Sequence, residues 1–167
     1  EDAKRCRGAL ATAWSEIQGA AERWYDRSSA CSFTTFHAWE YSRSPALAKV
    51  HRNVILRNEI SPELPFSWLD SPTEHDLWRQ LRQFCNETDS ACDAITIPHN
   101  PNLSNGQLFS IWYRDLSLEE QRREARQRAE IEPLVEMMQL KGESECRNGL
   151  YGVIGGPDEL CDFEKIR

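Results

Sequence analysis

Three side chains in this sequence are of types that could hold a metal ion together. Glu40, His51 and His99 each lie at or beside the end of a predicted strand. A carboxylate and neutral imidazoles are ligands that zinc, manganese or iron accept. Because 11 residues separate the first two and 48 the last two, only the fold could bring them together. The alternative is that they are three unrelated polar residues.

A polar loop follows the last of these predicted strands. The apolar run 94–97 predicts a buried strand, and residues 97–106 then supply one His, three Asn, a Ser, two Pro and a Gly. A loop of this composition is rigid and offers many hydrogen-bonding groups. In α/β folds, ligands collect at the C-terminal ends of strands. The segment 97–106 is therefore expected to be either part of a binding site or a tight turn with a solvated His.

Other catalytic patterns are missing from the sequence. It contains no Gly-x-Ser-x-Gly nucleophile elbow and no Gly-x-x-x-x-Gly-Lys-Ser/Thr phosphate loop. Of the two remaining histidines, His75 is expected on the surface of a helix, and His37 lies inside a strand with its facing undecided.

Composition restricts the class of protein. A chain of 167 residues can bury the core of one domain, and its net charge of −7 argues against nucleic acid as the main partner. No run approaches the apolar length of a membrane span. The chain opens without Met or a signal peptide, which indicates a processed protein or an excised piece.

The six cysteines form no Cys-x-x-Cys pair, so a zinc ribbon is not expected. They fall into three local couples, which we predict as the disulfides Cys6–Cys31, Cys85–Cys92 and Cys146–Cys161. Disulfides would place the protein in an oxidising compartment, periplasmic or secreted. The alternative is six free thiols.

Helical and strand patterns alternate along the chain. Such alternation predicts an α/β fold in which at least part of the sheet is parallel. Helices are expected over 8–26, from a capping box at 71–74 to 84, and from a second capping box at 117–120 to 131; strands are expected over 32–39, 50–57, 94–97 and 134–140.

Four stretches of the sequence resemble a family of exported bacterial proteins related to the PHP (polymerase and histidinol phosphatase) metal-dependent hydrolases. The stretches are Phe33–Tyr41, His51–Ile55, Ile97–Gly106 and Glu132–Glu145, and the resemblance covers essentially the whole chain. It implies a distorted β/α barrel of mostly parallel strands with flanking helices. It also implies two or three metal ions at the strand ends, and hydrolysis of phosphate esters by metal-bound water.

The resemblance assigns roles to individual residues. Glu40 would be a carboxylate ligand that could bridge two ions, and His51 and His99 would be imidazole ligands. Zinc, manganese or iron would lower the pKa of bound water and hold the anionic oxygens of a substrate. Residues that could orient an anionic ester or support the ligands are Arg52, Asn100, Asn102, Asn105 and Lys141.

Three ligand motifs of the family are missing. The PHP barrel begins with His-x-His and Asp-His motifs and ends with a further Asp/His pair, and this sequence has none of them. Residues 1–167 are therefore expected to form the central segment of one PHP-like domain, or a version lacking half of the metal site. Alone, the segment would retain a partial site and little activity.

Two hypotheses of function follow. In the first, the chain is part of a metal-dependent hydrolase of a small phosphate or related anionic ester. In the second, it is a disulfide-stabilised, non-catalytic binding or scaffolding module that uses the 97–106 loop. The sequence makes no prediction of oligomeric state.

Overall fold

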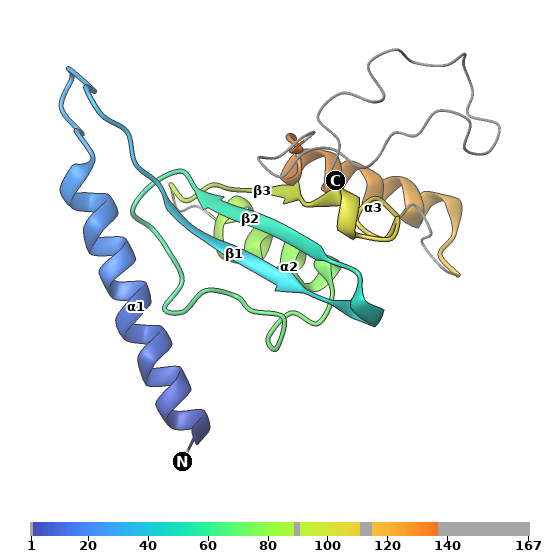
Figure 1. Ribbon diagram of the computed structural model, residues 1–167. Coiled ribbons are helices and arrows are strands. Elements are labelled where there is room, and N and C mark those ends of the chain that lie inside the picture. The colour runs from blue at the N-terminus through green and yellow to red at the C-terminus, as the bar shows by residue number, and fades with distance from the viewer. Residues whose placement is uncertain (1, 89–90, 111–114, 137–167) are drawn as a thin grey trace, which may run out of the picture.

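The computed structural model describes every residue except 1, 89–90, 111–114 and 137–167. Figure 1 shows three strands side by side, with α2 behind them and α1 standing apart from the sheet. The elements, in chain order, are α1 (Asp2–Trp24), β1 (His37–Arg43), η1 (Pro45–Leu47), β2 (Val50–Leu56), α2 (Glu74–Leu81), η2 (Arg82–Asn86), β3 (Ala94–His99), η3 (Pro101–Leu103) and α3 (Leu118–Ile131).

The sheet is antiparallel, with the order β1-β2-β3. The predicted parallel β/α barrel is therefore wrong. Only residues 44–49 join β1 to β2, whereas a parallel pair needs a crossover of about a dozen residues or more. The longer connection through α2 also returns antiparallel: the backbone N–H of Arg57 donates to the carbonyl of Asp93 at 2.9 Å, so β3 begins where β2 ends.

The first strand begins later than the sequence pattern predicted. We expected a strand over 32–39 with Glu40 after its end, but β1 runs from His37 to Arg43 and places Glu40 in its middle. The aromatic and β-branched residues that suggested an earlier start include Phe33 and Phe36, which are exposed. Strand propensity alone therefore located the strand but misplaced its boundary.

The two faces of the sheet differ because side chains alternate along each strand. Tyr41, Val54 and Leu56 point to the face covered by α2, where they form a buried core with Leu77 and Leu81. The three predicted metal ligands occupy alternate positions and so belong to the opposite face.

Capping boxes start both later helices. The N-cap of α3 is Ser117, paired with Glu120 as predicted. For α2 the box is two residues later than predicted, because Thr73, rather than Ser71, accepts the backbone N–H of Asp76. Ser71 is buried instead, and its carbonyl accepts the hydroxyl of Tyr41 at 2.6 Å.

One predicted disulfide is confirmed and another is wrong. Cys85 and Cys92 are bonded and close the loop after α2, whereas Cys6 and Cys31 are exposed free thiols. Cys6 lies near the start of α1, about 27 Å along the helix axis from its last residue, Trp24, since each residue rises about 1.5 Å. Cys31 follows that end. The predicted third bridge, Cys146–Cys161, lies outside the described residues.

The long first helix contacts the rest of the chain through few residues. Trp14 is its one buried side chain among those described, and its indole N–H donates to the carbonyl of Pro62 at 2.9 Å. The Trp14 ring also meets the Trp39 ring edge to face, with centroids 5.5 Å apart. Within the described parts of the chain, no helix is long and apolar enough to cross a membrane.

Candidate metal centre

Glu40, His51 and His99 converge on the sheet face opposite α2. One ligand atom from each lies within 4.8 Å of the others. Oε1 of Glu40 is 3.0 Å from Nδ1 of His51 and 3.5 Å from Nε2 of His99. All three sequence-predicted ligands are thus brought together, although they come from three different strands.

Strand register produces this convergence. His51 and His99 are directly opposite partners in the β2–β3 ladder, with ring centroids 5.5 Å apart. Ser42 is the partner of His51 in the β1–β2 ladder, so Glu40 is its diagonal neighbour on the same face. Opposite and diagonal neighbours on one face are the pairs that can touch across an antiparallel sheet.

The environment of His51 favours the neutral, metal-binding form of its imidazole. Burial lowers the pKa of His51 from its usual value of 6.5, against the opposing attraction of the Glu40 carboxylate, and the nearby His99 and Lys49 lower it further. The side chain of His51 is 18 % exposed and that of His99 13 %, whereas Glu40 is 48 % exposed. The carboxylate therefore faces solvent, and the two rings are largely buried beneath it.

The geometry fits a metal ion. Ligand atoms bound tetrahedrally at about 2.1 Å lie about 3.4 Å from one another, close to the two distances from Glu40. Nε2 of His99 is fully buried and has no hydrogen-bond partner among the described residues. A buried polar atom without a partner is costly, and a metal ion would satisfy it. One carboxylate and two imidazoles also match the donor set that zinc, manganese or iron accepts.

Asn100 supports His99 from behind. The nitrogen of its side-chain amide lies 2.7 Å from Nδ1 of His99. Turning the amide over exchanges its nitrogen and oxygen, and the oxygen then accepts a hydrogen bond from Nδ1–H, which leaves the lone pair of Nε2 for a ligand. The carboxylate of Glu136 holds this residue in place by accepting the backbone N–H of Asn100 at 3.0 Å.

The whole chain, residues 1–167, matches the model of a family described as "Protein of unknown function (DUF3604)". The chain belongs to this family. No curated protein and no solved structure matches it.

Arg52 lies away from the metal centre in this DUF3604 member. The sequence suggested that it could orient an anionic ester, but its side chain is fully buried on the helix-covered face. Its guanidinium forms an ion pair with Glu132, which also accepts the indole N–H of Trp78 at 3.1 Å and the hydroxyl of Thr96 at 3.0 Å. Alternation puts Arg52 on the opposite face from its neighbour His51, so it belongs to the buried network that joins α3 to the sheet.

The remaining predicted site residues are distributed along the loop and beyond it. Asn105 is exposed and, like Asn100, has a positive φ, which Asn tolerates better than most residues. Asn102 lies in η3. Lys141 lies outside the described residues.

His37 is separate from the three ligands. It is buried on the opposite face of β1 from Glu40, with Nε2 3.2 Å from a Glu22 carboxylate oxygen and Nδ1 3.2 Å from the Ser61 hydroxyl. Its contacts link α1 to the sheet. Its role in the described structure is thus to hold the helix.

Sequence reasoning missed two polar residues beside the ligands. Ser42 donates its hydroxyl to Oε1 of Glu40 at 2.9 Å. Lys49 directly precedes β2 between two buried residues, so alternation turns its side chain toward the face of His51. Period-two alternation from His51 would have identified Lys49.

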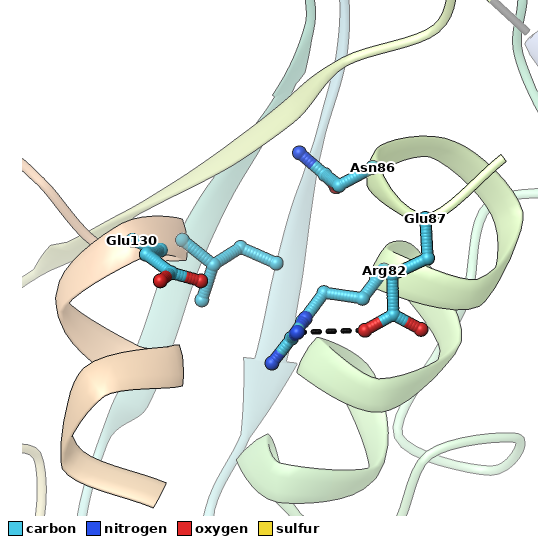
Figure 2. A pocket seen from close by; sticks show the side chains of 5 residues that line it. Arg82, Asn86, Glu87 and Glu130 are labelled. Carbon is cyan, nitrogen blue, oxygen red and sulfur yellow. Dashed lines mark ion pairs between the residues drawn. The ribbon is translucent and has the colours of Figure 1, made fainter. Parts of the chain in front are cut away.

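A pocket elsewhere in the molecule is lined by both charged and apolar groups. It lies between η2 and α3, and Figure 2 shows Arg82 and Glu87 on one side of it, joined by an ion pair of 2.6 Å. Ile131, which also lines it, packs with the core on the helix-covered face, so the pocket is separate from the three ligands.

Proposed function

We propose that this chain supplies a divalent-metal site that hydrolyses a small phosphate or related anionic ester with metal-activated water. The observation that carries the proposal is the convergence of Glu40, His51 and His99 within 4.8 Å on the sheet face opposite α2. Three protein ligands are the number that catalytic zinc sites use when they keep a position open for water.

Each residue has a task in this proposal. The two imidazoles bind through Nδ1 of His51 and Nε2 of His99, and the exposed Glu40 carboxylate completes the set from the solvent side. Ser42 donates to Glu40 and fixes which carboxylate oxygen faces the rings. A bound divalent ion would lower the pKa of its water toward about 7 and attract the substrate's anionic oxygens.

The resemblance of the strings around these residues to PHP-type hydrolases supports this reaction class. We infer a relation to those enzymes from the resemblance of these sequence stretches alone. The inference does not include the parallel barrel of those enzymes. The Cys85–Cys92 disulfide supports export to an oxidising compartment.

The decisive experiment measures metal content and hydrolysis together. The protein is purified without chelator, its zinc, manganese and iron are quantified by elemental analysis, and turnover of 4-nitrophenyl phosphate and 4-nitrophenyl sulfate is followed. We expect about one equivalent of metal per chain and turnover that chelator removes. His99→Ala should lower metal content and turnover together.

Less than about a tenth of an equivalent of metal would overturn the metal site. Metal at full occupancy without turnover of either ester would overturn the hydrolase assignment and leave a metal-binding module. If the protein holds no metal and chelator does not change its ligand binding, the result would instead favour the non-catalytic module that uses the 97–106 loop.

A further inference from the structure

A lysine lies on the same sheet face as the three ligands. Lys49 directly precedes β2 and lies between two residues that are buried together in one cluster, so its side chain lies on the opposite side of the chain from theirs, as that of His51 does. The backbone N–H of Lys49 donates to the carbonyl of Leu103 at 2.8 Å, which ties this position to the loop that follows His99. The lysine is thus fixed at the edge of the candidate metal centre.

The ammonium group of Lys49 has no counter-ion among the described residues. Its one described side-chain contact is the hydroxyl of Ser44 at 3.4 Å. Ser44 follows Arg43, whose own charge is used in an ion pair of 2.8 Å with Glu74 on the other face. A half-buried cation that lies beside a hydroxyl and pairs with no carboxylate in the described part of the chain is available to a ligand.

The charge of Lys49 would help an anion to approach the site. The protein as a whole carries a net charge of −7, so an anionic substrate would otherwise approach a repulsive surface. A divalent ion and this ammonium together carry more charge than the carboxylate of Glu40 that faces them.

We propose that Lys49 is the anion-binding residue of this centre and that it selects a terminal phosphate monoester by binding a non-bridging oxygen of the phosphate. This inference rests on the proposed metal site. A monoester phosphate carries close to two negative charges at neutral pH, which suits a site holding both a divalent ion and an ammonium, whereas a diester carries one. The Ser44 hydroxyl beside the ammonium supplies a second donor for the same oxyanion.

The test uses two ligands and four proteins. Isothermal titration measures manganese binding without anion, and then inorganic phosphate and dimethyl phosphate binding to the loaded protein. The proteins are the wild type, Lys49→Met, Lys49→Arg and Lys4→Met. Lys4 is exposed in α1 and controls for the same change in net charge.

We expect Lys49→Met to weaken phosphate binding about 10- to 100-fold, the usual effect of losing a hydrogen bond to a charged group. Lys49→Arg should retain most of the affinity, and Lys4→Met should bind as the wild type does. Manganese binding by Lys49→Met should be unchanged or tighter, because the ammonium repels the ion. Wild-type protein should prefer phosphate to dimethyl phosphate, and Lys49→Met should lose much of this preference.

Several results would overturn the proposal. Equal phosphate affinities of the wild type and Lys49→Met would exclude Lys49 as the anion-binding residue while leaving the metal site intact. Joint loss of manganese and phosphate by Lys49→Met would show a structural role. Equal affinity for the two anions would exclude selection of a monoester.

Failure of the wild type to bind manganese would instead count against the proposed function. In that case phosphate titration of the metal-free proteins still decides the role of Lys49. Weak phosphate binding that Lys49→Met abolishes would support it, and its absence would refute it.

Discussion

His51 and His99 are directly opposite partners in the β2–β3 ladder, and their rings meet at 67° with centroids 5.5 Å apart. The candidate centre is therefore a product of strand register. A slip of one residue between these strands would turn one ring toward the helix-covered core. The core face prevents such a slip, because Val54 and Leu56 must stay buried against α2.

Replacing Glu40 tests whether the convergence is a metal site. Glu40→Gln keeps the size of the side chain but removes the charge that holds the ion. We expect divalent-metal affinity to fall at least about 10-fold and the rise in melting temperature on adding metal to shrink accordingly. Glu119→Gln, on the exposed face of α3, is the matched control and should leave both unchanged. Equal metal affinity in the two variants would exclude Glu40 as a ligand.

Asn100 offers a test of how His99 is oriented. Asn100→Gly tolerates the positive φ at this position but removes the amide beside Nδ1 of His99. Loss of such a support costs about 10- to 100-fold in metal affinity. Asn100→Asp keeps an acceptor and should retain metal. Asn105→Gly, also at positive φ in the same loop, controls for added backbone freedom and should bind metal normally.

The lowered pKa of His51 predicts a pH dependence of stability in the metal-free protein. The unfolded chain takes up a proton at His51 near pH 6.5, whereas burial keeps the folded protein's imidazole neutral to lower pH. Because the unfolded state then binds more protons, the contribution of His51 is complete above pH 6.5 and is lost as the pH falls below it. Urea denaturation between pH 8 and pH 5 measures this slope. His51→Gln should reduce the slope, and an unchanged slope would contradict the prediction.

Sequence reasoning found the ligands without finding the fold that gathers them. The residue types of Glu40, His51 and His99 indicated a metal site, and strand propensity located β2 and β3 closely. The predicted direction of the strands was wrong. An alternation of helices and strands along the sequence does not show whether a connection crosses over to a parallel strand or leads back into an antiparallel one. That depends on long-range contacts such as Arg57 with Asp93, which no local pattern encodes.

Burial was equally hard to predict for charged side chains. The family resemblance suggested that Arg52 could orient an anionic ester or support the ligands, and the structure shows it fully buried beside Glu132. The partner lies 80 residues away in the sequence, so no spacing rule could pair them.

Breaking the Arg52–Glu132 pair should be costly. The side chains are 0 % and 3 % exposed, and Glu132 also accepts hydrogen bonds from Trp78, Thr96 and Arg128. Glu132→Gln leaves a buried guanidinium without its counter-charge, and we expect the free energy of unfolding to fall by about 3–5 kcal/mol. Urea denaturation measures this loss.

The exposed pair of Glu119 and Arg122 is the comparison for that loss. Glu119→Gln should change the unfolding free energy by less than about 1 kcal/mol. The double variant Arg52→Met/Glu132→Leu should recover part of the stability lost in Glu132→Gln, because it removes both buried charges. A loss in Glu132→Gln as small as that in Glu119→Gln would show that the buried pair contributes little.

The cysteines allow a chemical test of the fold. Alkylation of the native, unreduced protein should label Cys6 and Cys31, which are exposed, and spare Cys85 and Cys92. Cys85→Ser/Cys92→Ser opens a short loop, and the chain-entropy model predicts a loss of about 2–3 kcal/mol in unfolding free energy. Cys6→Ser/Cys31→Ser should leave stability unchanged, since neither thiol is buried. Protection of Cys6 and Cys31 from alkylation until reductant is added would instead favour the bridge that the length of α1 argues against.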